Sequence, residues 1–266
     1  MLKQKRARLD LKKMGLKKLG LVILTAIGLT GCAEPQVKTQ AVDQPTAAVQ
    51  AADTVERNYI QPTQVPTTNA ARQAKLKSLN INADSPIQQR RLALFVRYTQ
   101  LTSNEKPELE VLDQLLVEIT ELTAKRKDDH ELGALLGSAT SLKTTFFLDN
   151  LGKVTLLSKK GSRYLDRAVK KAPNHLGVRL YRGITYAQMP AFLGKGRQAV
   201  GDFKLLKAGL DAKSSLDFIA MVDYYFAMAL IKNQQQDSGL AQLAQLAQKN
   251  IAPWSSKASK LIQQEG

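Results

Sequence analysis

Side chains that could perform acid–base or metal chemistry are few in this sequence. The two histidines, His130 and His175, lack other typical metal ligands around them, and His175 is expected in an exposed turn. The one mixed acidic cluster is Asp128-Asp129-His130-Glu131. It lies at an expected helix start, where carboxylates cap free amides and favour the positive end of the helix dipole. We interpret the cluster as structural, and the sequence predicts no catalytic residue, metal or cofactor.

The remaining reactive side chain is Cys32, the only cysteine, which cannot form an internal disulfide. It follows eight basic residues within the first 18 positions and an uncharged apolar run at 19–29. This order is typical of a signal peptide, and the run is about half the roughly 20 residues that a membrane-spanning helix needs. The sequence therefore predicts that residues 1–31 are a cleaved signal peptide.

The residues Leu29-Thr30-Gly31-Cys32 resemble the lipobox of bacterial lipoproteins. The resemblance implies that Cys32 becomes the lipidated N-terminus and that its acyl chains hold the protein to a membrane. The following Ala33-Glu34 lacks the aspartate of an inner-membrane retention signal. The resemblance therefore implies a cell-envelope lipoprotein in the outer membrane, facing the periplasm. The alternative is an ordinary secretory signal in which the cysteine is a coincidence.

Basic residues outnumber acidic ones along most of the chain. The formal net charge is +16; eight basic residues and Asp10 give the first 31 residues +7 of it, which leaves +9 for the mature protein. Such a charge favours acidic partners, such as phosphate-bearing lipids or anionic cell-wall polymers, through the summed surface potential. Nucleic acid is not expected as a partner of an exported protein.

Residues 32–84 lack a sustained apolar period and are rich in Ala, Gln, Thr, Pro and Val. Such a segment cannot bury enough apolar surface to offset the entropy lost on ordering. We therefore expect a disordered tether after the lipidated cysteine, with only transient helix around Asn69–Leu79. The alternative is that part of this segment pairs as a strand against the folded domain.

Residues 85–266 form the expected folded domain, because their apolar residues recur with a helical period. Asp84-Ser85-Pro86 and Asp128-Asp129 offer helix starts, and Asn150 with Gly152 suits the left-handed end of a helix that reaches Leu148. No stretch alternates with the period of a strand. The expected fold class is all-α, with about nine helices stacked as antiparallel pairs. They begin near residues 86, 107, 130, 153, 176, 197, 214, 237 and 253.

Part of this domain resembles a tetratricopeptide repeat (TPR), a helix-turn-helix unit of 34 residues. Small residues, large apolar residues and a proline recur with its spacing; they are Gly161, Leu165, Ala168, Pro173, Gly183, Tyr186, Ala199 and Phe203. The resemblance implies a TPR-like domain in which paired helices approach closely at the small residues. The last two residues come about four positions late, because the turn at 188–194 is long. Arg179 and Arg182 stand where the family prefers apolar residues.

Two surface features could bind a partner. Arg163, Arg167, Lys170 and Lys171 fall on one side of a helix and could form an anion-binding face. The alternative is a solvated charged face that keeps the domain soluble. The apolar turn at 189–193 could be an exposed contact or could tuck into the core.

Residues 216–231 are apolar almost all round, which predicts a central helix packed on several sides. The alternative is that their Met and aromatic side chains line an apolar pocket.

The leading functional hypothesis is a non-catalytic protein-interaction or scaffold module, held in the envelope by its acyl chains and binding an envelope protein. A second is a small-molecule binding lipoprotein, because the helical composition and lipid anchor are similar to those of the T component of TRAP transporters. That hypothesis predicts an apolar cavity near residues 216–228. A third is a binder of anionic lipid or cell-wall polymer through the basic helix face. No enzymatic activity is expected.

Overall fold

The protein was analysed as a computed structural model, which describes Tyr59 and residues 63–104 and 106–265. All of them belong to one compact unit, Pro45–Gly266. The predicted signal peptide, the residues Leu29, Thr30 and Gly31 of the lipobox-like sequence, and Cys32 lie outside the described residues, as does most of the expected tether.

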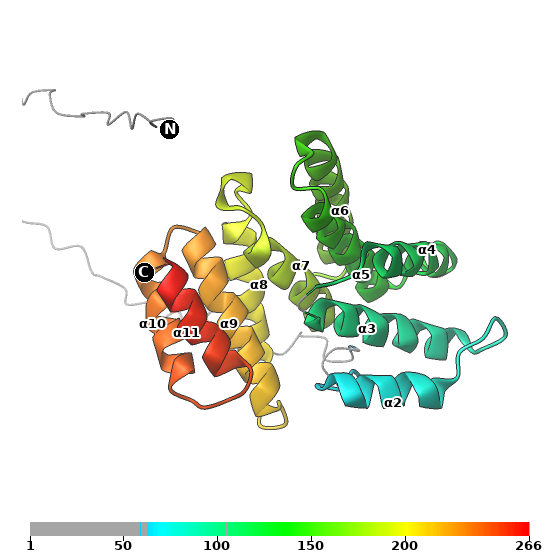
Figure 1. Cartoon of the computed structure of the whole chain (residues 1–266), viewed down its shortest axis with the longest axis horizontal. Helices are drawn as coiled ribbons and strands as arrows, with labels where there is room; N and C mark the ends of the chain where they lie inside the picture. Colours follow the sequence, from blue (N-terminus) through cyan, green and yellow to red (C-terminus); the bar gives the residue numbers. More distant parts are fainter. Residues whose placement is uncertain (1–58, 60–62, 105, 266) are drawn as a thin grey trace, which may run out of the picture. The chain divides into compact units, whose positions relative to one another are not determined.

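The described part of the chain is all-α and contains no strand, as the sequence predicts (Figure 1). Two short 3-10 helices, η1 (Lys143–Phe146) and η2 (Ala191–Leu193), interrupt the α-helices. The α-helices are α2 (Asn69–Leu79), α3 (Ile87–Ser103), α4 (Leu109–Lys125), α5 (His130–Leu142), α6 (Leu151–Lys171), α7 (Leu176–Gln188), α8 (Gly196–Gly209), α9 (Leu216–Lys232), α10 (Gln236–Ala247) and α11 (Trp254–Glu265).

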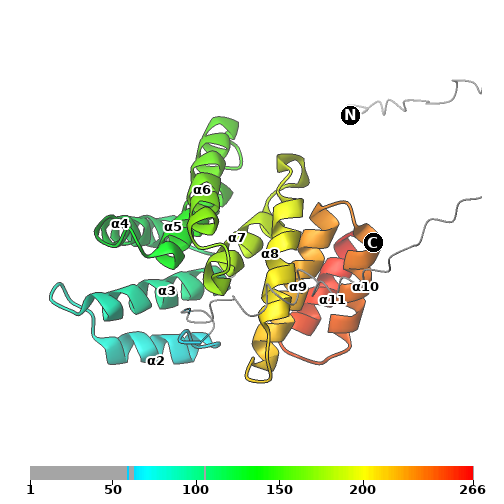
Figure 2. The same ribbon diagram turned by 180° about the vertical axis from the view of Figure 1, so that it is seen from behind.

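Successive helices pack side by side, most closely in the pairs α5 with α6, α7 with α8 and α9 with α10. Alternate helices also touch: α3 contacts α5, α5 contacts α7, α7 contacts α9, and α9 contacts α11 (Figures 1 and 2). Helices α5, α7 and α9 therefore each contact the other helix of their own pair and at least one helix on either side of that pair. As expected, α9 is packed on several sides, by α7, α8, α10 and α11.

Close packing of the pairs depends on small residues. A side chain at Gly161 of α6 would place its Cβ 2.8 Å from the carbonyl oxygen of Gly137 in α5, and would also overlap Ser141. A Cβ at Gly183 of α7 would lie 3.2 Å from the ring of Phe203 in α8. These two glycines therefore set how closely each pair approaches.

The folded domain begins earlier than the predicted boundary at residue 85. Tyr59 and Val65 are buried in the main core, and α2 packs on α3. Arg72 of α2 is only 7% exposed; its guanidinium donates to the carbonyl oxygens of Pro66 and Thr67, and to Ser103 at the end of α3. The helix expected to be transient at Asn69–Leu79 is thus a packed element, which corrects the assignment of residues 63–84 to a disordered tether.

Three local assignments also need correction. Helix α3 begins after Pro86 without a side-chain cap, so Asp84 does not cap it. The third expected helix does not reach Leu148, because α5 ends at Leu142 and η1 follows. Asn150 accepts from the backbone N–H of Lys153 at 2.9 Å, so it caps the start of α6 and does not end the preceding helix.

The predicted cap of α5 is confirmed, because the Asp129 carboxylate accepts from the N–H of Leu132.

Candidate functional site

A buried carboxylate fixes the pair formed by α7 and α8. Asp202 is fully buried, and its two oxygens accept from Arg179 at 2.7 Å and from Arg182 at 2.7 and 2.8 Å. Burial alone would lower the pKa of Arg182, but its hydrogen bond to Asp202 and the charges of Asp202 and Asp166 raise it. Both arginines therefore have a structural role.

A groove of about 870 Å³ lies between α6 and the connection from α7 to α8. Its walls combine basic residues with two serines, Met189, Leu193 and a single acid, Asp166. The basic residues are Lys159, Arg163, Arg167, Lys170, Lys171 and Lys195. We call this the cationic groove. It brings together the two surface features that the sequence suggests separately, the basic face of α6 and the turn at 189–193.

The only acid of the cationic groove is already neutralised. Asp166 accepts from the Tyr186 hydroxyl at 2.8 Å and from Arg182 at 3.2 Å, and the Lys195 amine lies 3.5 Å away. Burial and the hydrogen bond to Asp166 raise the pKa of Tyr186, so its hydroxyl keeps the proton that it donates.

The predicted anion-binding residues Arg163, Arg167, Lys170 and Lys171 are all exposed. None of them makes an ion pair with another described residue. Their charges therefore remain available to a ligand.

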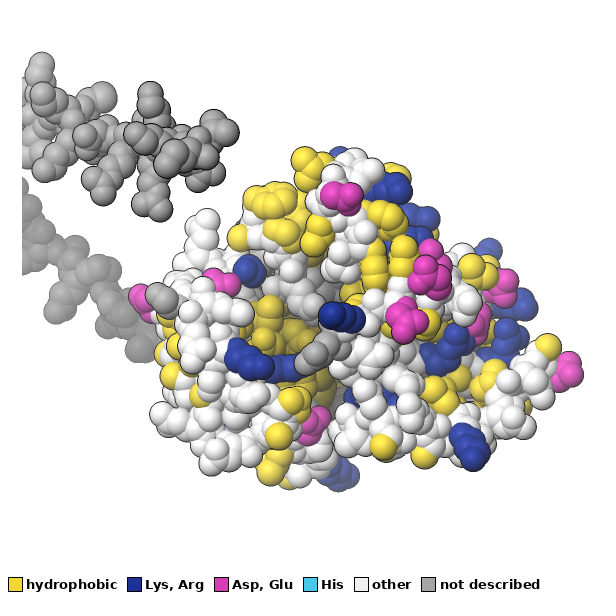
Figure 3. All heavy atoms as spheres, viewed as in Figure 1, with side chains coloured by type: hydrophobic (Ala, Val, Ile, Leu, Met, Phe, Trp, Pro, Cys, Tyr) yellow, Lys and Arg dark blue, Asp and Glu magenta, His cyan; other side chains and the backbone are white. Residues whose placement is uncertain are grey.

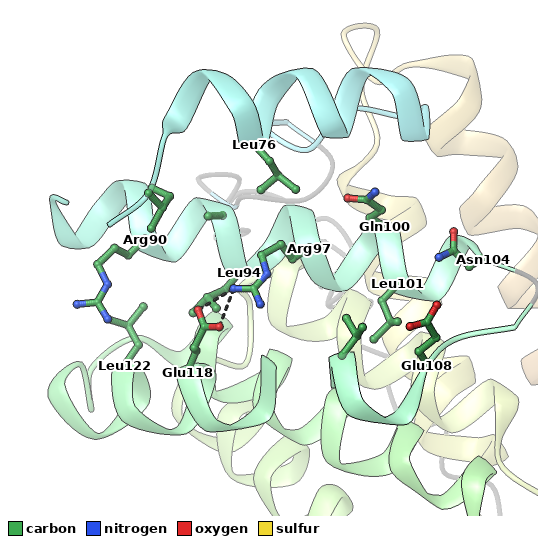
Figure 4. A pocket seen from close by; sticks show the side chains of 13 residues that line it. Leu76, Arg90, Leu94, Arg97, Gln100, Leu101, Asn104, Glu108, Glu118 and Leu122 are labelled. Atoms are coloured by element: carbon green, nitrogen blue, oxygen red, sulfur yellow. Dashed lines mark hydrogen bonds and ion pairs between the residues drawn. The ribbon is translucent and has the colours of Figure 1, made fainter. Parts of the chain in front are cut away.

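A second groove, of about 680 Å³, lies where α2, α3 and α4 meet (Figure 4). Its floor consists of apolar side chains from all three helices: Leu76, Ala93, Leu94, Leu101 and Leu122. Figure 4 shows Leu76 reaching from α2 toward α3, opposite the side chains of α4. We call this the α2–α4 groove. Sequence reasoning missed it, because one of its walls belongs to the segment expected to be a disordered tether.

The rim of the α2–α4 groove is polar. Arg97 of α3 donates to both oxygens of Glu118 in α4, at 2.8 and 2.7 Å, and this pair joins the two walls. Arg90 is half-buried and makes no ion pair with a described residue, and Gln100 and Glu108 complete the rim. An apolar floor with polar groups around it suits a ligand that has one apolar face.

The residues of the TPR pattern lie mostly in the interior. Seven are buried where helices meet: Gly161, Leu165, Ala168, Gly183, Tyr186, Ala199 and Phe203. Pro173 is exposed in the turn between α6 and α7, where its carbonyl oxygen accepts from Arg179. These residues position the elements that form the cationic groove and are not part of a binding surface themselves.

Both histidines have local structural positions. His130 is the first residue of α5. His175 is half-buried, and its Nδ1 accepts from the N–H of Val178 at 3.3 Å, so it caps α7 and is not the freely exposed residue expected. Within the described ranges there is no cluster of His, Cys, Asp or Glu that could hold a metal ion.

Neither groove involves α9, although the small-molecule hypothesis predicts an apolar cavity near this helix. The aromatic side chains Tyr224 and Tyr225 of that helix stack against Trp254 of α11 instead. None of the described helices has the length and apolar character needed to span a membrane.

Comparison with family models, with curated proteins and with solved structures finds no match for this chain.

Proposed function

We propose that this chain is a non-catalytic interaction module of the bacterial cell envelope, anchored in the outer membrane through acyl chains on Cys32. The anchoring is supported by the sequence pattern of a basic segment, an apolar run and Leu29-Thr30-Gly31-Cys32. We also propose a TPR-like repeat. Support comes from the contacts between alternate helices and from the burial of the small residues Gly161 and Gly183 where pairs approach.

The observation that carries the proposed function is the α2–α4 groove. Leu76, Ile81 and Val111 leave apolar surface exposed along it, above a floor of buried leucines. Arg90, Gln100 and Glu108 offer hydrogen bonds at its edge. An amphipathic helix of another envelope protein could place its apolar side chains on such a floor and its polar side chains against the rim. The groove therefore supports a protein partner that presents a short segment with one apolar face.

Photo-crosslinking in the native envelope tests this proposal. A photoreactive amino acid at Val111, which lines the groove, should capture one envelope protein as a discrete adduct. The same substitution at Val117 is a matched control, because this valine is exposed on the same helix and does not line the groove. Equal adducts from both positions, or none from Val111, would contradict the proposal.

A second candidate function is small-molecule binding, similar to the T component of TRAP transporters. The volume of the α2–α4 groove favours it, because about 680 Å³ lies within the range of roughly 300–1,000 Å³ that is usual for ligand sites. Mass spectrometry of the natively purified protein distinguishes the two candidates. A small molecule that co-purifies, and is lost when the exposed groove residue Val111 is replaced by a bulkier Trp, would favour this alternative.

A further inference from the structure

The most exposed large apolar side chains of the described chain are concentrated on two neighbouring elements. The five highest exposures belong to Phe192 at 85%, Leu151 at 77%, Leu148 at 72%, Leu216 at 70% and Leu156 at 67%. Leu151 and Leu156 lie at the beginning of α6, Leu148 lies in the turn before it, and Phe192 lies in η2. Single exposed apolar residues are normal on a soluble domain, but such a concentration indicates a contact surface.

The cationic groove lies next to this apolar cluster, because its α6 wall begins at Ser158 and its other wall includes Leu193 of η2. The start of α6 and the η2 turn project in the same direction in both ribbon views (Figures 1 and 2). Along α6, Leu156 precedes Arg163 by two helical turns, so both side chains lie on the same outward face. Figure 3 shows hydrophobic side chains over this end of the domain, with Lys and Arg side chains and an acidic side chain next to them.

Two of the basic residues beside the apolar cluster, Lys159 and Lys160, make no ion pair within the described chain. They follow Leu156 by one turn and are exposed. The combination of protruding apolar side chains and free cations matches the two layers of a membrane surface, acyl chains below and phosphate groups above. An acidic protein segment without apolar side chains would satisfy the cations but would leave Phe192 and Leu151 in water.

We propose that the start of α6 and the η2 turn form a second membrane contact, which inserts Leu148, Leu151, Leu156 and Phe192 into a bilayer surface rich in anionic phospholipid. Lys159, Lys160 and the residues of the cationic groove bind the lipid phosphates. The inference rests on the proposed function in one respect, because the acyl chains on Cys32 bring this surface to a membrane. The contact orients the domain and leaves the α2–α4 groove to a protein partner.

The absence of any cysteine other than Cys32 makes a specific test feasible. In the acylated full-length mature protein, Phe192→Cys or Leu151→Cys gives one free thiol for an environment-sensitive fluorophore. Leu216→Cys is the matched control, since it replaces an equally exposed leucine at the start of α9. The labelled protein is reconstituted on vesicles of phosphatidylcholine with or without phosphatidylglycerol, and lipid-borne quenchers report the depth of the label.

We expect labels at positions 192 and 151 to shift to the blue and to be quenched on vesicles that contain phosphatidylglycerol, while the label at 216 stays in water. Labels at 192 and 151 that stay in water, or that change only when an envelope protein fraction is added, would overturn the inference. An unacylated protein would take up a second label at Cys32, and this result would defeat the anchoring and the inference together.

The contribution of charge is tested separately. Lys159→Ala with Lys160→Ala should lower the equilibrium constant for insertion roughly thirtyfold, because each basic residue near an anionic surface contributes about a fivefold effect. Lys204→Ala with Lys260→Ala is the control, since both of these lysines are exposed and lie outside the groove. Equal effects of the two double variants would contradict a localised contact.

Discussion

Two pairs of arginines on neighbouring helices have different roles despite similar spacing. Arg163 and Arg167 stand four residues apart on α6, and Arg179 and Arg182 stand three apart on α7. The α7 pair binds the buried carboxylate of Asp202, whereas the α6 pair is exposed and has no acidic partner. Helical spacing places basic residues on one face of a helix. Whether their charge stabilises the fold or can bind a ligand depends on whether another helix supplies an acidic partner.

The largest effect is expected at the buried carboxylate. Asp202→Ala should lower the free energy of unfolding by about 3–5 kcal/mol, because it leaves two largely buried guanidiniums without their counter-charge. Urea denaturation measures the loss. Asp149→Ala, at an exposed aspartate without a described ion pair, should change stability by less than about 0.5 kcal/mol. Similar losses of unfolding free energy in the two variants would contradict a structural role for Arg179 and Arg182.

We expect the domain to lose stability at high pH because of a tyrosine in its interior, and not because of residues on its outer face. Burial raises the pKa of Tyr98 from 10.0 to about 12. Between these values the unfolded chain loses the tyrosine proton and the folded chain keeps it, so stability that is fully present below pH 10 is lost as the pH rises through 12. This tyrosine accounts for up to about 3 kcal/mol of that loss.

Denaturation at pH 9 to 12 measures this effect. Tyr98→Phe should make the stability curve less steep, whereas Lys159→Ala on the outer face should leave its shape unchanged. An equally steep curve for Tyr98→Phe would show that another group controls alkaline unfolding.

The inner face of α6 should tolerate change less well than exposed helix positions. Gly161→Ala should destabilise the domain by about 1–3 kcal/mol, because the new methyl group would overlap Ser141 and the backbone of Gly137. Gly201→Ala in α8 is the control. Its Cβ meets no atom within 4 Å, so stability should rise by about 0.5–1 kcal/mol through helix propensity. Thermal unfolding of both variants checks the contrast.

The smallest effect on stability is expected where the charges are free. Arg163→Ala with Arg167→Ala should change the free energy of unfolding by less than about 0.5 kcal/mol, because neither side chain is buried or paired. The same double variant should weaken binding to anionic vesicles, measured by co-sedimentation at increasing salt. A large loss of stability would mean that these arginines are structural as well.

Much of the helical layout could be predicted from the sequence because its signals are local. The apolar period, the Asp129 cap and the stop near Pro173 are read within a few residues, and nine expected helices correspond to α3 through α11. Helix α2 was underestimated, because hydrogen bonds from Arg72 to the chain before α2 and to Ser103 help to hold it in place. Such contacts leave no periodic pattern in the sequence.

The candidate surfaces could be predicted only in part. The sequence indicates the basic face of α6 and the turn at 189–193 separately. It does not indicate that they line one groove, because this depends on how α6 packs beside α7. Asp202 was missed, since it follows Arg179 by 23 residues and resembles any surface acid of an amphipathic helix. The α2–α4 groove required the three-dimensional packing of α2.

The central claim is that a lipid on Cys32 holds this helical domain at a membrane, and the intact mass of the native protein tests it most directly. The account predicts a mature chain that begins at Cys32 and carries the added mass of two or three acyl chains. A chain of unmodified mass that still begins at Met1 would contradict it.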